Sequence, residues 1–291
     1  MLRLVLPKGS LERATISLFE EADLALRRGS DRDYKATIDD PRISEVRILR
    51  PQEIPRYVAQ GLFDLGITGR DWIEETDSEV VSLSELHYSK MTARPVSIVV
   101  AVPKDSPVNS VGDFKPGTRV STEFPTLTQR HFDKHCVDVD IQLSYGSTEA
   151  KVPDIVDAIV DLTETGASLR AAGMKIIDTI LVSHTELIAN PTSYADADRR
   201  HAMEQIATLL IGTLEARGKV LVKLNVAAEQ LDAVIGILPT LKAPTVSKLF
   251  GDGGYAVETV VAKSEINTLI PALKDHGATD IIELPLSKIV H

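Results

Sequence analysis

The sequence predicts an α/β protein with two lobes of alternating strands and helices, followed by a smaller βαββαβ module. Short apolar runs at residues 2–6, 46–49 and 64–67 alternate with segments of helical spacing. An unbroken β-branched run at residues 96–102 starts a new set of strands. A hydrophilic break at 217–219 precedes a third set of strand and helix patterns.

In the first lobe we expect a strand at residues 2–6, followed by a helix that Ser10 caps and that runs to Ala22. Residues 27–33 are charged and predict a loop. A helix at 54–60 ends at Gly61, and a second short helix follows Asp71. Because strands alternate with helices, we expect largely parallel sheets with ligands at the carboxyl ends of the strands.

In the second lobe we expect strands at 96–102 and 119–122 and a helix that reaches His135. Residues 175–188 predict one long strand that leaves this lobe. A helix at about 195–216 carries one apolar stripe, which closes the core of the first lobe. The predicted limits are 1–92 with 184–216 for the first lobe and 93–183 for the second.

Residues 217–291 predict the third unit. Its strands are expected at 220–225, 255–262 and 280–284, its helices at 229–237 and 266–274, and a further strand at 244–248. This order is a ferredoxin-like βαββαβ pattern, which by itself specifies no chemistry.

The composition excludes several classes of protein. The chain has 291 residues, 43% hydrophobic and 25% charged, which is typical of a globular protein of two or three domains. A net charge of −10 argues against non-specific nucleic-acid binding. The single cysteine, Cys136, excludes an intramolecular disulfide. No apolar run is long enough to cross a membrane, and the N-terminal segment lacks a signal-peptide core, so we expect a cytoplasmic protein.

Residues 155–169 form the most informative motif. An apolar run containing Asp157 and Asp161 leads into Thr163-Glu-Thr-Gly166-Ala-Ser-Leu169, and a helix follows. Unpaired N–H groups at a helix start bind phosphate, and Gly166 lets the backbone approach closely. The two aspartates suit sugar hydroxyls. The motif therefore predicts a site for a ribose 5-phosphate such as that of phosphoribosyl pyrophosphate (PRPP); the alternative is an ordinary N-cap with two solvated aspartates.

Three basic residues could supply positive charge in this acidic protein. Lys8 lies at a strand–loop–helix corner, Arg50 ends a strand, and Arg32 lies in a loop. Together they could hold a pyrophosphate leaving group; separately each could be a solvated surface charge. Asp64, Asp71 and Glu149 could touch ribose hydroxyls or hold Mg²⁺ through water.

We interpret several other residues as structural rather than catalytic. His131 and His135 have i, i+4 spacing but no evident third metal ligand, so we interpret them as a surface pair. Trp72 is interpreted as a packing residue of its short helix. No residue pattern supports nucleophilic catalysis.

Five segments in order, at residues 6–11, 49–55, 64–71, 123–127 and 161–169, resemble one family. This is the ATP phosphoribosyltransferase family, and the resemblance covers essentially the whole chain. Residues 241–246 resemble the long-form enzymes, which carry their own regulatory domain. The resemblance implies a two-lobed core like that of type II periplasmic binding proteins. It also implies transfer of the phosphoribosyl group of PRPP to N1 of ATP with Mg²⁺, inhibition by histidine, and a homo-oligomer that interconverts between dimer and hexamer.

Site residues carried over from the resemblance fall into four groups. The catalytic basic residues are Lys8, Arg32 and Arg50. The PRPP residues are Asp157, Asp161, Thr163, Glu164, Thr165, Gly166, Ala167, Ser168 and Leu169. The ATP residues are Gly9, Asp71, Glu123, Phe124 and Glu149. The histidine residues are Asn225, Leu241, Ala243, Thr245, Val261 and Asp280.

The chain also departs from the family pattern. Ser168 stands where relatives usually have threonine, and the segment between Glu149 and Asp161 is one residue shorter than in many relatives. Asn225 stands where aspartate would hold the histidine amine. The resemblance implies that Mg²⁺ is held mainly by substrate phosphates. The alternative function is a non-enzymatic cytoplasmic solute-binding sensor with the same two-lobed fold.

Overall fold

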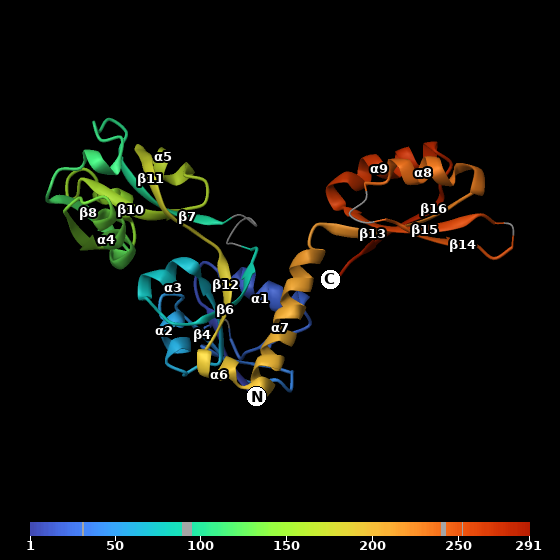
Figure 1. Ribbon diagram of the computed structural model, residues 1–291, viewed down its shortest axis with the longest axis horizontal. Helices are drawn as coiled ribbons and strands as arrows, with labels where there is room; N and C mark the ends of the chain where they lie inside the picture. Colours follow the sequence, from blue (N-terminus) through green and yellow to red (C-terminus); the bar gives the residue numbers. More distant parts are fainter. Residues whose placement is uncertain (31, 89–94, 240–242, 252) are drawn as a thin grey trace. The chain divides into compact units, whose positions relative to one another are not determined.

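The computed structural model describes residues 1–30, 32–88, 95–239, 243–251 and 253–291 (Figure 1). The chain forms two compact units, residues 1–207 and 208–291, which divide within helix α7 (Ala197–Ala216). The first unit contains two sheets, and we call the parts built on them the first and second lobes. The predicted limits of the lobes and of the third unit stay predictions, and the predicted 92/93 boundary lies outside the described residues.

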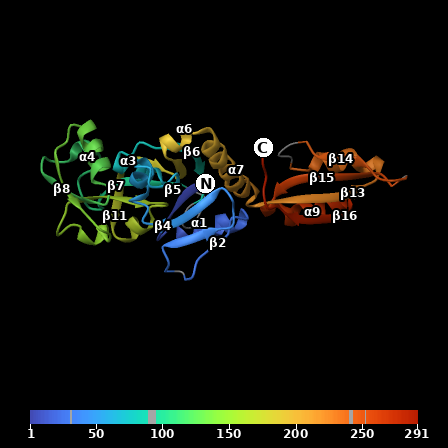
Figure 2. The same cartoon turned by 90° about the horizontal axis from the view of Figure 1, so that it is seen from below.

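The first lobe is built on a seven-stranded sheet with the order β2-β3-β4-β1-β5-β12-β6. Its strands are Leu26–Arg27, Lys35–Ile38, Ile43–Leu49, Leu2–Pro7, Leu65–Gly69, Thr185–Ala189 and Val81–Leu86. Strand β1 pairs in parallel with both β4 and β5, and its apolar side chains are buried. Strand β2 forms the outer edge (Figure 2). The carboxyl ends of β1, β4 and β5 therefore share one edge of the sheet.

Helices α1 (Glu12–Glu21), α2 (Ile54–Ala59), α3 (Arg70–Thr76) and α6 (Pro191–Ala195) belong to this lobe. Met203 and Ile206 of α7 are fully buried, as the predicted apolar stripe requires. The predicted Ser10 cap is wrong. The N-cap of α1 is Leu11, and no side chain caps the helix; the Glu12 carboxylate instead accepts a hydrogen bond from the Gly9 N–H (3.4 Å) in the preceding loop.

The second lobe is built on a five-stranded sheet with the order β11-β7-β10-β8-β9. Its strands are Met174–Ser183, Val96–Pro103, Ala158–Thr163, Thr118–Thr122 and Val139–Leu143. Helices α4 (Pro125–Lys134) and α5 (Ala167–Ala171) and 3-10 turns at Val111–Asp113 and Thr148–Lys151 connect them. A buried core around Val100, Val120 and Phe132 fills one side of the sheet. Strand β10 pairs in parallel with β8, so their carboxyl ends also coincide.

Two expectations about the strands need correction. Residues 175–188 form two strands, because the chain passes from one sheet to the other: β11 ends at Ser183, and β12 starts at Thr185. His184 lies between them, and its carbonyl accepts the Arg70 N–H (2.9 Å). The sheets are mixed, since β7 and β12 run antiparallel to their neighbours.

The second unit confirms the predicted βαββαβ order. Its sheet has the order β14-β15-β13-β16, with strands Thr245–Lys248, Tyr255–Ala262, Lys219–Val226 and Thr279–Pro285, all antiparallel. Helices α8 (Leu231–Ile237) and α9 (Ile266–Asp275) cover one face, each preceded by a 3-10 turn, at Ala228–Gln230 and Lys263–Glu265 (Figure 1). Alternate residues of β13, such as Val222 and Leu224, are buried in the core of this unit.

Among the described residues, no helix combines the length and the hydropathy that are needed to span a bilayer. The cytoplasmic location stays a prediction.

Candidate active site

A cavity of about 670 Å³ lies in the first unit, and both lobes form its walls. The first lobe contributes the start of α1, the end of β5 and the end of β6; the second lobe contributes the loop after β10. The lining residues are Ser10, Leu11, Pro51, Gly69, Asp71, Trp72, Leu86, His87, Tyr88, Pro95, Val96, Leu162, Thr163, Glu164, Thr165, Ala167, Ser168, Ser183, His184 and Thr185. The cavity therefore lies where parallel strands end, as the fold class predicts.

The predicted phosphate loop forms one wall of this cavity. Gly166 has φ +70°, a left-handed conformation that favours glycine, and its N–H donates to the Thr163 hydroxyl (2.8 Å). A Cβ at this position would lie 2.7 Å from Nη1 of Arg170, whose other nitrogen donates to the Thr165 carbonyl (2.9 Å). Leu169 is buried in the core and anchors the loop. The loop is thus held in shape before any ligand binds.

Asp161 lies near two other acidic residues of the second lobe. Burial raises the pKa of its carboxyl, and the charge of Glu149 raises it further, although the Leu162 N–H and the Thr148 hydroxyl donate to it. Burial likewise raises the pKa of Glu123, and Asp161 adds to the effect while Lys151 opposes it. Three of the predicted acidic residues therefore influence one another, although only Asp161 shares strand β10 with the phosphate loop and none of the three is among the residues that line the cavity.

Asp157 lies at the opposite end of β10. Its carboxylate accepts from the Arg119 backbone N–H (2.9 Å) and from two guanidinium nitrogens of Arg119 (3.1 and 2.8 Å). These bonds hold the pKa of Asp157 below its usual value, although burial opposes them. The six residues of β10 lead from Asp157 to the start of the loop at Thr163, about 20 Å of extended chain. The structure does not bring Asp157 to the cavity.

Asp71 is 3% exposed and lines the cavity. Burial raises its pKa to about 6, although the Ser183 hydroxyl donates to it (2.9 Å). Gly69 makes room for this carboxylate, since a Cβ there would lie only 1.9 Å from Asp71 Oδ1. Sequence reasoning missed Ser183, because it is 112 positions away and no local pattern connects the two.

The predicted basic residues lie at the first-lobe edge but outside the set of lining residues. Lys8 forms an ion pair with Glu12 (3.3 Å) and lies 5.4 Å from the centre of the Tyr34 ring. Gly9 has φ +86° and precedes the lining residue Ser10. Arg50 is exposed and precedes the lining residue Pro51, and Arg32 is exposed in its loop. The i, i+4 spacing of Lys8 and Glu12 could have revealed their pairing.

The two lobes also contact each other through α3 and α4. The Glu75 carboxylate of α3 accepts the Thr126 and Leu127 N–H groups (3.0 and 2.9 Å) at the start of α4. Phe124 is 2% exposed and its ring centre lies 4.7 Å from that of Trp72. Phe124, a predicted ATP residue, is thus packed behind Trp72, which lines the cavity. Sequence reasoning missed the role of Glu75.

Comparison with known proteins identifies the family. The family model described as ATP phosphoribosyltransferase matches residues 50–212, and the model of its C-terminal domain matches residues 216–288. A protein named ATP phosphoribosyltransferase from Desulforudis audaxviator (strain MP104C) is 45% identical over 289 residues, 99% of each chain. The chain belongs to the ATP phosphoribosyltransferase family. A relative of the same name from Solibacter usitatus (strain Ellin6076) is 46% identical over 290 residues, 100% of this chain and 99% of its own.

A solved structure agrees with this assignment and with the predicted fold class. It is the ATP phosphoribosyl transferase (HisG:HisZ) complex from Thermotoga maritima, with a TM-score of 0.63 and 26% identity. The match covers 74% of this chain and 99% of that chain. The second unit of our protein is matched instead by the C-terminal domain model of the family.

The predicted histidine residues are only partly brought together in the second unit. The Asn225 amide donates to Oδ2 of Asp280 (3.0 Å), so these two lie side by side. Thr245 and Ala243 are exposed, whereas Val261 is fully buried in the core beneath the helices. Leu241 lies outside the described residues.

Proposed function

We propose that the protein transfers the 5-phosphoribosyl group of PRPP to N1 of ATP and releases pyrophosphate, the first step of histidine biosynthesis. The observation that carries this proposal is the shared cavity. It places a preformed loop of hydroxyls and small residues opposite a buried carboxylate from the other lobe. Family membership supplies the reaction class, and the cavity supplies a place for two substrates to meet.

The loop at 163–168 is the proposed site of the PRPP 5-phosphate. Thr163, Thr165 and Ser168 offer hydroxyl donors on the cavity wall, and the left-handed Gly166 removes the Cβ that would keep the phosphate away. Asp161, on the same strand, is the proposed acceptor for ribose hydroxyls. We leave Asp157 out of the site, because Arg119 holds it at the far end of the strand.

Asp71 is the proposed partner of the adenine amine. A carboxyl with a pKa of about 6 is ionised at neutral pH, and its buried position strengthens a hydrogen bond to the N6 amine. As N1 attacks the anomeric carbon, positive charge develops on that amine. The Asp71 carboxylate stabilises this charge and accepts the departing proton, so no covalent intermediate is needed.

The leaving pyrophosphate needs positive charge. Lys8, Arg50 and Arg32 lie along the first-lobe edge and are the proposed source, with Lys8 released from Glu12 when substrate binds. The residues also fit Mg²⁺. Burial and the charge of Glu149 raise the pKa of Asp161, burial and the charge of Asp161 raise the pKa of Glu123, and all three carboxylates offer oxygen ligands. When bound, Mg²⁺ would neutralise charge on the pyrophosphate, and the substrate phosphates would supply most of its ligands.

A direct assay tests the proposal. The protein is incubated with ATP, PRPP and Mg²⁺ while the absorbance of phosphoribosyl-ATP and the release of pyrophosphate are followed. We expect both products in equal amounts, and neither when PRPP is omitted. ATP binding without either product would contradict the proposal and favour the solute-binding sensor.

The second unit is the proposed regulatory domain. We expect histidine to inhibit the enzyme there and to favour a hexamer over a dimer, with Asp280 in place of the missing aspartate at Asn225. The Thermotoga maritima chain, which matches 74% of ours, was solved in a complex of two proteins. We propose that this chain needs no second protein, because it carries its own C-terminal domain. Histidine titration of the Asp280→Ala variant, followed by activity and light scattering, tests this; unchanged inhibition would contradict it.

A further inference from the structure

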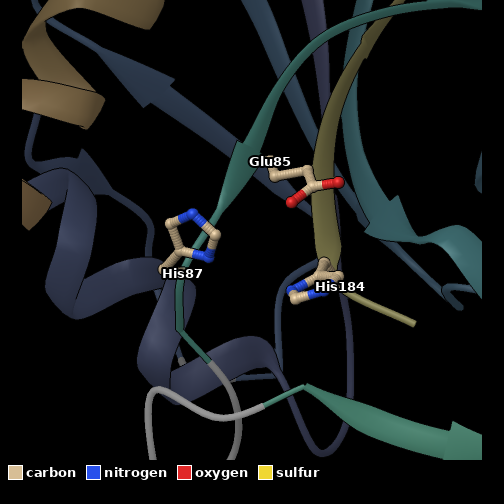
Figure 3. Close-up of side chains that lie close together, drawn as sticks. All are labelled: Glu85, His87 and His184. Carbon is tan, nitrogen blue, oxygen red and sulfur yellow. The ribbon is translucent and has the colours of Figure 1, made fainter. Parts of the chain in front are cut away.

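Three side chains with metal-binding atoms converge where the chain leaves the first lobe. Glu85 projects from β6, His87 follows that strand, and His184 lies between β11 and β12 (Figure 3). One ligand atom of each lies within 4.8 Å of the others. The two imidazole rings meet edge to face, with their centres 5.7 Å apart. Glu85 and His87 are exposed and His184 is partly buried, so the group is open to ions from solvent.

The strand register places a second acidic group next to this cluster. Glu85 of β6 is directly opposite Glu186 of β12, and such cross-strand partners point to the same face of a sheet. Glu186 is 3% exposed, and its Oε2 has no hydrogen-bond partner among the described residues. Arg70 approaches only the other oxygen, at 3.7 Å. Two opposed carboxylates destabilise each other, and a bound cation would relieve this repulsion.

We propose that Glu85, His87 and His184 bind a divalent transition metal of the zinc class. Two imidazoles and one carboxylate are the ligand set that Zn²⁺ takes with a fourth position open, and imidazole favours Zn²⁺ over Mg²⁺. Bonds of about 2.1 Å to a tetrahedral ion place its ligand atoms roughly 3.4 Å apart. The ligand atoms therefore need to approach one another by at most about 1.5 Å, which rotation of the side chains allows.

The site would join the two segments that pass between the lobes. His184 connects β11 to β12, and His87 precedes the passage from β6 to β7. Both histidines also line the cavity. A metal bound to both would tie these segments together, and its fourth position would take water or an oxygen of a bound anion. Since the metal binds the folded chain, it would stabilise it.

A second histidine cluster in the same chain provides an internal control. Ligand atoms of His131, His135 and Asp178 also lie within 4.8 Å of one another. Asp178 is thus a candidate third ligand, which no sequence pattern indicated. In this cluster, however, His131 Nε2 already contacts Asp178 (3.1 Å), and His135 Nδ1 contacts the His131 carbonyl (2.9 Å). In the described part of the chain, Glu85, His87 and His184 make no such side-chain hydrogen bonds.

The test is calorimetric titration of the untagged, EDTA-treated full chain with ZnCl₂. We expect one strong site, a higher melting temperature with zinc, and no loss of binding in excess MgCl₂. His184→Ala and His87→Ala should each weaken zinc binding at least about 100-fold, since even indirect ligand changes cost 10–100-fold. His131→Ala should leave it unchanged. Circular dichroism without zinc verifies that each variant is folded.

Cobalt provides a second readout at the same site. Co²⁺ should give a visible absorption band typical of mixed nitrogen and oxygen ligands, and Glu85→Gln should change that band while His135→Ala should not. Zinc binding that survives His184→Ala but is lost in His131→Ala would move the site to the other cluster and overturn the proposal. Absence of zinc binding by the parent chain would also overturn it. Neither result would bear on the phosphoribosyl transfer proposed above.

Discussion

The two ends of strand β5 carry aspartates with opposite surroundings. Asp64, just before the strand, is 1% exposed and accepts hydrogen bonds from Arg3, Ser193 and Arg199. Burial alone would raise its pKa, but the bonds from Arg3 and Ser193 more than offset this and hold it below its usual value. Asp71, just after the strand, is 3% exposed and has no cationic partner in the described structure, and burial raises its pKa to about 6.

Strand β10 repeats the contrast. Asp157 precedes it and is paired with Arg119, whereas Asp161 and the phosphate loop lie towards its other end, with a raised pKa at Asp161. We call the N-terminal end of each strand its entry end and the C-terminal end its exit end. In both strands the aspartate at the entry end is paired with arginine, which stabilises the fold. The polar groups at the exit end lie at or near the cavity. From this difference we propose that the carboxylates which the fold leaves without a cation, Asp71 and Asp161, are the ones that act on substrate.

The largest expected effect is on stability, at the entry end of β5. Asp64→Asn removes the charge that three side chains share, so the free energy of unfolding should fall by about 2–4 kcal/mol. Urea unfolding measures this change. PRPP dependence of the remaining folded enzyme should be unchanged; a stable variant with impaired PRPP use would place Asp64 in the site.

Gly166→Val should weaken PRPP binding by the loop at the exit end of β10. A β-branched residue at φ +70°, with its Cβ 2.7 Å from Arg170, should reshape the loop and weaken PRPP binding by about 100-fold or more. Gly173→Val is the matched control, because Gly173 has φ +75° but does not line the cavity. Both variants should lose stability through the strained backbone, and Gly166→Val somewhat more, because a Cβ at Gly173 would meet no atom within 4 Å. Equal PRPP affinity in the two variants would contradict the proposal that the loop at residues 163–168 binds the PRPP 5-phosphate.

The Asp71→Asn variant tests the exit end of β5 through the pH dependence of protein stability. The folded pKa of about 6 lies above the usual 3.8, so between these values the folded chain holds a proton that the unfolded chain has lost. The penalty for burying the charge therefore grows as pH rises through this window and is complete above pH 6. The variant should be more stable than the parent by about 3 kcal/mol at pH 8 and by almost nothing at pH 4.

Thermal and urea unfolding across pH 4–8 checks this prediction, and ATP use should fall in the same variant. A variant that is less stable than the parent at pH 8 would mean that Asp71 is a structural residue like Asp64.

The sequence predicted the fold well because its signals are local. Apolar runs and breaks located β1, β7 and the βαββαβ unit, and Gly166 marked the loop. It failed where the outcome depends on distant partners. Nothing near Asp157 indicates Arg119, nothing near Asp71 indicates Ser183, and the break at His184 follows from the change of sheet. For the same reason, the sequence did not show that Asp157 and Asp161 lie towards opposite ends of β10; their roles in PRPP binding stay predictions.

The most direct test of this account is the dissociation constant of PRPP, measured by calorimetry with Mg²⁺, for Asp161→Asn beside Asp157→Asn. We expect Asp161→Asn to bind PRPP at least about tenfold more weakly, because a charge-assisted hydrogen bond contributes 1.5–3 kcal/mol. Asp157→Asn should bind PRPP normally and lose less than about 1 kcal/mol of stability, because its ion pair is partly exposed. Weaker PRPP binding in Asp157→Asn with normal binding in Asp161→Asn would contradict the account.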